Sequence, residues 1–236
     1  MIVATGLSKR FGAVQVLREL DLHIVPGRVT AIVGPNGAGK TTFIKTLLGL
    51  SRPDAGTLTF DGAPVEDDET YRARIGYMPQ IARYPENLTG ADLLALLHDL
   101  RGAPAIDVRL VGQLALGDAL RKPLRTLSGG TRQKVNAVAA FLFTPECYVL
   151  DEPTAGLDPV AAGVLKRRIL EERAAGRTVI LTSHVMSEID ELADDVVFLV
   201  EGRARFAGGI GALKRWAGEV RLERAIAELM TREVAA

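Results

Sequence analysis

The clearest chemical signal in the sequence is a glycine-rich segment that ends in lysine and threonine. It reads Gly34-Pro35-Asn36-Gly37-Ala38-Gly39-Lys40-Thr41 and fits the pattern G-x-x-x-x-G-K-[ST]. An apolar run precedes it and a helical pattern follows it, which is the strand–loop–helix setting that the pattern requires. Glycines let backbone N–H groups converge on phosphate oxygens, and the helix dipole adds positive charge. We therefore predict a nucleotide site rather than a glycine-rich turn without a ligand.

The polar side chains at the end of this segment have separate expected roles. Lys40 is expected to reach the β- and γ-phosphates and to act in catalysis, and Thr41 to place its hydroxyl on Mg²⁺. Thr42, the next residue, is grouped with the nucleotide-binding residues of the segment.

Two adjacent acids, Asp151 and Glu152, follow a second apolar strand pattern. A carboxylate at the C-terminal end of a parallel strand points into the crevice where ligands lie, so Asp151 is predicted to hold Mg²⁺, directly or through water. Glu152 is expected to point elsewhere, as adjacent strand residues do, and to polarise the attacking water as general base. The alternative is a simple strand-to-loop turn, and the phosphate pattern upstream argues against it.

A second anion-binding segment is predicted at Ser128-Gly129-Gly130, which opens a helical pattern. Small residues, free N–H groups, a hydroxyl and a positive dipole end suit a phosphate. One nucleotide needs only one such cradle within a chain. The second cradle therefore implies that another copy supplies the γ-phosphate.

With four further short matches in a fixed order, the sequence resembles the nucleotide-binding subunits of ABC transporters over essentially its whole length. The segment 127–133 is similar to that family's signature segment. The other matches are Gln80 in 76–80, Asp158 in 155–158, His184 in 181–184 and Phe11 in 9–12. Each match is weak alone, and their common order makes the resemblance specific.

The resemblance implies a head-to-tail dimer, with ATP held between the phosphate loop of one copy and the signature segment of the other. It adds Asp158 to the nucleotide-binding residues. Gln80 is expected to contact Mg²⁺ or the attacking water, and His184 to hydrogen-bond the γ-phosphate and orient Glu152 or water. A structural histidine is the alternative for His184.

Two positions depart from the commonest form of the family. Phe11 is expected to stack on adenine although the family more often has tyrosine there, because the hydroxyl is not part of the π-face; a core aromatic is the alternative. Thr131 replaces a frequent glutamine after Ser-Gly-Gly, which puts a role for that side chain in doubt and leaves the backbone cradle intact.

These residues need a scaffold that brings strand ends together, and the pattern of short apolar runs alternating with helical patterns predicts an α/β fold. We expect a P-loop NTPase cassette of the ABC type, with a parallel core sheet, an antiparallel β flank and a helical subdomain insertion. The predicted core strands are 29–33, 148–150, 178–182 and 196–200, and the predicted flank strands are 2–7, 20–25 and 57–60. The predicted helices are 41–48, 91–100, 130–143, 159–174, 185–192 and 222–230.

The predicted organisation has four parts: residues 1–80 and 128–205 form the two parts of the ATPase core, 81–127 the helical insertion, and 206–236 a short C-terminal helical extension. A long helical crossover is the open alternative for 81–127. The acidic run 66–69 is expected to be a solvated loop.

Composition limits the class of protein. The 236 residues carry 29 Lys and Arg against 29 Asp and Glu, so the formal net charge is zero, and 47% are hydrophobic. The zero net charge argues against a generally basic nucleic-acid binder and leaves a local basic groove as the alternative, while the composition excludes a globally disordered chain. One cysteine, Cys147, suits a reducing compartment. No apolar run reaches the roughly 20 residues of a membrane span, so we expect a cytoplasmic protein, peripheral on the inner face of the cell membrane.

The function that the resemblance implies is ATP hydrolysis coupled to export or translocation by a separate membrane permease. Within the family, the short C-terminus is similar to the ABC-2 exporter branch, and 77–88 with the ending to the ATPase of nitrous-oxide reductase maturation. The alternatives are a soluble ABC ATPase that acts on DNA or ribosomes, and a kinase or unrelated phosphate-loop protein. The first usually has two cassettes or long coiled-coil insertions, and the second leaves the Ser-Gly-Gly segment and His184 without a role. No nucleic-acid partner is expected.

Overall fold

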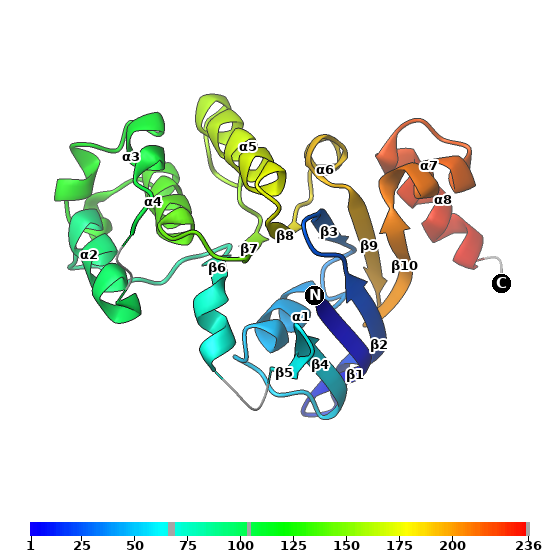
Figure 1. Ribbon diagram of the computed structural model, residues 1–236. Helices are drawn as coiled ribbons and strands as arrows, with labels where there is room; N and C mark the ends of the chain where they lie inside the picture. The colour runs from blue at the N-terminus through cyan, green and yellow to red at the C-terminus, as the bar shows by residue number, and fades with distance from the viewer. Residues whose placement is uncertain (66–68, 103–104, 235–236) are drawn as a thin grey trace.

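A mixed sheet of six strands forms the centre of the computed structural model, which describes residues 1–65, 69–102 and 105–234 (Figure 1). Three of the four residues of the acidic run, 66–68, lie outside the described residues. The strands, in spatial order, are β10 (Arg203–Gly209), β9 (Asp195–Val200), β3 (Val29–Val33), β8 (Thr178–Thr182), β7 (Cys147–Asp151) and β6 (Ile75–Met78). All neighbours pair in parallel except β10, which runs antiparallel to β9 at one edge.

The four predicted core strands are confirmed as β3, β7, β8 and β9, because nearly uninterrupted apolar runs, typical of strands buried on both faces, are readable from sequence. The edge strands β6 and β10 were not predicted. β6 is four residues long and contains Gly76, and β10 ends in two glycines, so neither has a strong strand pattern. Because β10 continues to Gly209, residues 206–209 are strand, and the C-terminal helices begin at Ile210 rather than at 206.

A second, antiparallel sheet forms the predicted flank. Its order is β2 (Val14–Ile24), β1 (Ile2–Phe11), β4 (Ala55–Phe60) and β5 (Ala63–Pro64). The helix α1 (Lys40–Leu47) lies between the two sheets, since Phe43 and Ile44 share one buried cluster with flank residues and with Ile32 of β3. Alternate residues of β3, such as Ala31, face the opposite cluster. The core sheet is thus covered on both faces, as its apolar strands require.

Helices cover the other face of the core sheet. They are α4 (Gly129–Phe141), α5 (Pro159–Ala174) and α6 (Met186–Leu192), with α2 (Gly90–Arg101) and α3 (Arg109–Gln113) farther out beside α4 and with α7 (Ile210–Ala217) and α8 (Leu222–Val234) beside β10 (Figure 1). Among the described residues, no helix is both long and apolar enough to cross a membrane.

The segment 81–127 carries α2, α3 and short 3₁₀ turns, and its described residues form no named strand. It is also part of the connection from β6 to its parallel neighbour β7. Helical insertion and helical crossover therefore describe the same stretch of chain. Figure 1 shows its helices set apart from the antiparallel flank.

A buried ion-pair network ties this segment to α5. The Arg168 guanidinium, 2% exposed, lies 2.7 Å from Asp107 Oδ2 and 2.6 Å from Glu172 Oε1. Arg109 also donates to Asp107, at 2.7 Å, and Arg177 Nε lies 2.9 Å from Glu172. Hydrogen bonds from Arg109, and then from Arg168, hold the pKa of Asp107 well below its usual range.

Asp107→Asn is expected to lower the free energy of unfolding by about 2 kcal/mol, because the buried Arg168 loses a charged hydrogen-bond partner. The depressed pKa means that the contribution is complete above the ordinary aspartate pKa and is lost as the pH falls toward the folded-state value. Urea unfolding at neutral pH measures the change. The matched control is Asp118→Asn, which removes an exposed partner of Arg121 and should leave stability unchanged. Equal losses in both variants would contradict the assignment.

Candidate functional site

The phosphate loop joins β3 to α1 and requires glycine at two positions for steric reasons. Gly34 has a φ of +148°, and a Cβ there would lie 2.1 Å from the carbonyl oxygen of Leu199. Gly39 has a φ of +106°, and its Cβ would lie 2.8 Å from the Leu17 side chain. The loop therefore passes closer to β2 and β9 than a side chain would allow.

The loop forms one wall of a cavity of about 420 Å³. Four separate segments line it: residues 36–42, Gln80 after β6, Asp151 at the end of β7 with Glu152 after it, and His184 after β8; Val16 of the flank completes the wall. All three strands end at the same edge of the sheet, where ligands of open α/β sheets bind. The structure thus brings together residues 36–42 of the predicted loop with Gln80, both acids and His184, whereas the predicted Gly34 and Pro35 do not line the cavity.

The Lys40 ammonium donates to the carbonyl oxygens of Gly34 and Pro35, at 2.6 and 3.0 Å. Burial lowers the pKa of Lys40, and the carboxylates of Glu152 and Asp151 oppose that shift. A partly desolvated cation that faces two acids is well placed to neutralise phosphate charge.

The two acids after β7 line the same cavity, and the expectation that Glu152 points elsewhere is wrong. Glu152 has a φ of +51°, in the left-handed region that non-glycine residues seldom adopt. This backbone turn breaks the alternation of a strand, so neighbouring side chains reach one space. Strain of this kind persists only where the surroundings fix it.

Thr182, at the end of β8, makes the hydrogen bonds that hold Glu152 in this conformation. Its buried hydroxyl donates to Asp151 Oδ1 at 2.5 Å, while the Glu152 amide donates to the Thr182 Oγ1 at 3.0 Å. Sequence reasoning missed Thr182. The available signal was a hydroxyl residue at the end of an apolar strand, two positions before His184.

Glu152 faces His184 across the cavity. The His184 amide donates to Glu152 Oε2 at 3.3 Å, and His184 Nε2 lies 3.2 Å from Oε1, without the geometry of a hydrogen bond. Oε1 is buried and has no hydrogen-bond partner among the described residues. Burial raises the pKa of Glu152, with His184 opposing the shift. The Glu152 carboxylate is therefore more basic than an exposed one, and its Oε1 can still accept a hydrogen bond.

The oxygen donors of the cavity fit Mg²⁺. Asp151, the hydroxyl of Thr41 and the side-chain oxygen of Gln80 are hard ligands of the kind that Mg²⁺ prefers, and all three residues line the cavity. The unpartnered Glu152 oxygen stands beside them.

The Ser128 segment lies apart from this cavity. Ser128 is exposed and caps α4, with its Oγ accepting from the Thr131 amide at 3.2 Å and lying 2.9 Å from the Thr131 hydroxyl. Gly129 is also exposed, and a Cβ on Gly130 would lie 2.9 Å from the Gly156 carbonyl oxygen. Thr131 therefore has a local role in the helix cap.

Asp158 and Phe11 also lie outside the cavity lining. Asp158 caps α5 through the Ala161 amide, at 2.8 Å, and its other oxygen lies 2.8 Å from Lys134 Nζ. The hydrogen bond from Lys134 lowers the pKa of Asp158.

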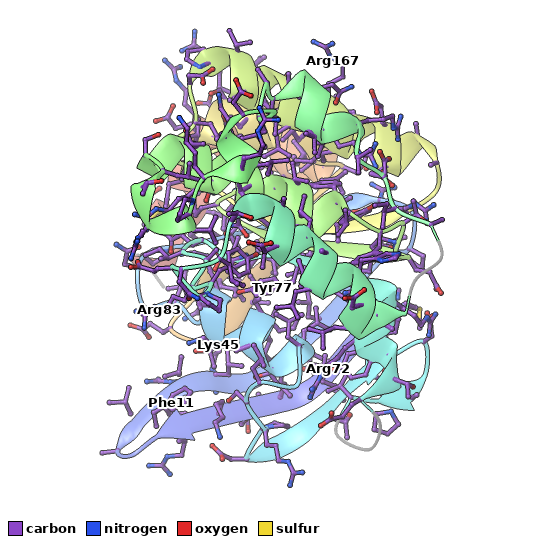
Figure 2. All side chains as sticks on the ribbon, turned by 90° about the vertical axis from the view of Figure 1, so that its left-hand side faces the viewer. Phe11, Lys45, Arg72, Tyr77, Arg83 and Arg167 are labelled. Carbon is purple, nitrogen blue, oxygen red and sulfur yellow. The ribbon has the colours of Figure 1, made fainter. Side chains whose placement is uncertain are left out.

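Phe11 is 51% exposed at the outer tip of the hairpin of β1 and β2, as Figure 2 shows, with Lys9 Nζ 5.5 Å from its ring centre. The alternative of a core aromatic is therefore wrong.

Comparison with known proteins agrees with this geometry. The family model described as ABC transporter matches residues 17–155. The daunorubicin/doxorubicin resistance ATP-binding protein DrrA of Streptomyces peucetius is 37% identical over 90% of this chain and 66% of its own length. The Nod factor export ATP-binding protein I of Ralstonia nicotianae is 35% identical over 84% of this chain and 64% of its own. The chain thus spans about two thirds of the length of these relatives.

A solved structure described as the ATP binding subunit of an ABC transporter superposes with a TM-score of 0.90 at 31% identity, covering 98% of this chain and 99% of the other. The match extends over both sheets and the helical segment, so the whole described chain shares one architecture with it. The chain therefore belongs to the ABC transporter family and has the fold of its ATP-binding cassette.

Proposed function

We propose that this chain binds and hydrolyses Mg²⁺–ATP and supplies the energy for export through a separate membrane subunit. The observation that carries the proposal is the shared cavity of Lys40, Asp151, Glu152 and His184, with an unpartnered carboxylate oxygen on Glu152. The names of the relatives, a drug-resistance protein and an export protein, support the exporter direction.

The residues of the cavity have separate proposed roles in ATP hydrolysis. The amides of the phosphate loop and Lys40 bind and orient the β- and γ-phosphates. Glu152 Oε1 accepts a proton from the attacking water, and its raised pKa strengthens it as a base. His184 hydrogen-bonds the γ-phosphate and restrains Glu152. Mg²⁺ held by Thr41, Gln80 and Asp151 would neutralise charge on the phosphate oxygens.

The site is proposed to be completed by a second, identical copy. The exposed Ser128 and Gly129 lie outside the phosphate cavity of their own chain, so their free amides are available to the γ-phosphate of a partner. Asp158, at the start of α5, is proposed to contact the nucleotide of the partner in the same way. Phe11, exposed at the hairpin tip, is proposed to stack on adenine.

The membrane subunit is proposed to dock on the helical segment, at the cytoplasmic face of the membrane. A cavity of about 390 Å³ is lined there by Ile81, Arg83, Tyr84 and Leu124, and Ile81 is 73% exposed. An exposed apolar side chain at the rim of a cavity suits a protein partner. The similarity to the nitrous-oxide reductase maturation ATPase remains a prediction.

Glu152→Gln is expected to lower kcat on the order of 10²- to 10⁴-fold, because the amide cannot take a proton from water. ATP binding should persist, and an ATP-bound dimer should accumulate. Phosphate release and gel filtration with ATP measure the two effects. Glu19→Gln is the control, since Glu19 is also an acid at positive φ, but it is exposed and outside the cavity. Undiminished turnover in Glu152→Gln would refute the general-base role.

Ser128→Arg is expected to block closure of the dimer by bulk and charge at the second cradle, while each monomer still binds ATP. Mixing it with Lys40→Ala should restore one composite site, from the intact loop of the first variant and the intact signature of the second. ATPase activity of the mixture, compared with each variant alone, measures this. Absence of recovery, with both variants folded by circular dichroism, would count against the head-to-tail arrangement.

Affinity purification from detergent-solubilised membranes distinguishes the exporter from the alternative function on DNA or ribosomes. The exporter predicts a stoichiometric membrane protein that disappears when Ile81 is changed to Asp, because a charge at the rim of the cavity opposes an apolar contact. Recovery of rRNA or DNA instead would favour the alternative.

A further inference from the structure

A buried asparagine on α4, Asn136, makes contacts that the mechanism above does not use. Its side chain is fully buried. Nδ2 donates to the carbonyl oxygen of Pro79 at 2.8 Å, and Oδ1 accepts from the hydroxyl of Tyr84 at 3.1 Å. Pro79 immediately precedes Gln80, and Tyr84 lines the 390 Å³ cavity of the helical segment. Asn136 therefore lies between that cavity and the residue proposed to reach Mg²⁺.

The orientation of the Asn136 amide follows from its neighbours. A carbonyl oxygen can only accept, so the Pro79 oxygen requires the NH₂ group of Asn136. Burial raises the pKa of Tyr84 to about 12, so its hydroxyl stays protonated at neutral pH and can donate to Oδ1. Exchanging the two ends of the amide would put two acceptors face to face at Pro79.

A second branch leads from Asn136 to the general base. Gln133, one turn earlier on α4 and 8% exposed, has its Oε1 3.5 Å from Asn136 Nδ2. Gln133 Nε2 donates to the carbonyl oxygen of Pro153 at 3.4 Å, and Pro153 directly follows Glu152. These bonds are longer than those to Pro79 and Tyr84, so the stronger connection runs from Tyr84 to Pro79.

We propose that Asn136 is a positioning residue that fixes the Pro79-Gln80 peptide against α4, so that Gln80 faces the phosphate cavity, and that connects it to Tyr84 in the wall of the second cavity. A buried side chain on α4 that is hydrogen-bonded to both Pro79 and Tyr84 fixes the intervening stretch against the helix, because a displacement leaves a buried donor or acceptor unpaired.

This inference rests on the proposed ATP hydrolysis. It predicts a loss in the catalytic step and in the use of Mg²⁺, with nucleotide binding by the phosphate loop unaffected. A loss of catalysis without a loss of nucleotide binding indicates a positioning role. A general loss of stability would instead weaken catalysis and nucleotide binding together.

Two variants test the two ends of this connection, and Asn136→Asp also removes the donor that faces Gln133. Asn136→Asp keeps the shape and the acceptor for Tyr84 but places an oxygen opposite the Pro79 carbonyl. Tyr84→Phe removes only the hydroxyl. The matched control is Tyr148→Phe, which deletes a buried hydroxyl that donates to the Phe143 carbonyl at 3.3 Å, away from the proposed path. Thermal unfolding is followed for all three.

Asn136→Asp is expected to lower kcat about 10-fold, the size usual for a residue that orients a ligand of a metal. Tyr84→Phe should lower it about 3-fold, for the loss of one neutral hydrogen bond. Both should raise the Mg²⁺ concentration needed for half-maximal binding of a fluorescent ATP analogue, and both should leave binding of the analogue without Mg²⁺ unchanged. Tyr148→Phe should alter none of these.

Normal kcat and Mg²⁺ dependence in Tyr84→Phe and in folded Asn136→Asp would overturn the proposal, as would an equal loss in Tyr148→Phe. If Asn136→Asp does not fold, the result for Tyr84→Phe decides alone.

The unsubstituted chain and Glu152→Gln are measured in the same assays. No hydrolysis by the unsubstituted chain refutes the proposed function and this inference together, whereas hydrolysis that Glu152→Gln abolishes and the Asn136 and Tyr84 variants retain refutes this inference alone.

Discussion

The hydroxyl of Thr182 holds the junction on which the site depends. It donates to Asp151 at 2.5 Å and accepts from the Glu152 amide, so one buried group joins the ends of β7 and β8. These bonds fix Glu152 at a positive φ and turn both acids into the cavity of the phosphate loop. The Glu152 amide also donates to the Thr182 carbonyl oxygen at 3.2 Å, so both the side chain and the backbone of Thr182 hold this junction.

Two of the polar contacts around the helical segment differ in character. Asp107 of the helical segment forms a buried ion pair with Arg168 of α5, and both residues are distant in sequence from the phosphate loop. Asn136 makes a neutral hydrogen-bonded link to the peptide before Gln80. The charged pair contributes mainly to stability, because breaking it leaves the buried Arg168 with Glu172 as its remaining carboxylate partner. The neutral link adjoins the cavity and therefore bears on the position of Gln80.

The charges of the cavity explain how a chain of zero net charge can suit a polyanionic nucleotide. The proposed phosphate recognition uses loop amides, the start of α1 and Lys40 rather than bulk charge. Burial lowers the pKa of Lys40 and raises that of Glu152, and each of these shifts is opposed by the other group. The site therefore combines a cation and a base within one desolvated space.

The sequence by itself determined the phosphate loop, the four inner strands and the identities of both acids, because fixed glycine spacing and long apolar runs are local properties. It did not determine β6 or β10, whose strand state depends on pairing with β7 and β9 rather than on their own residues. Only the tertiary structure showed that Glu152 faces the cavity, that Thr182 holds it there, and that Asn136 touches Pro79 from 57 residues away. Each of these depends on contacts between distant segments or on a backbone angle, and the sequence carries at most an indirect signal of it, such as the hydroxyl residue at the end of the β8 run.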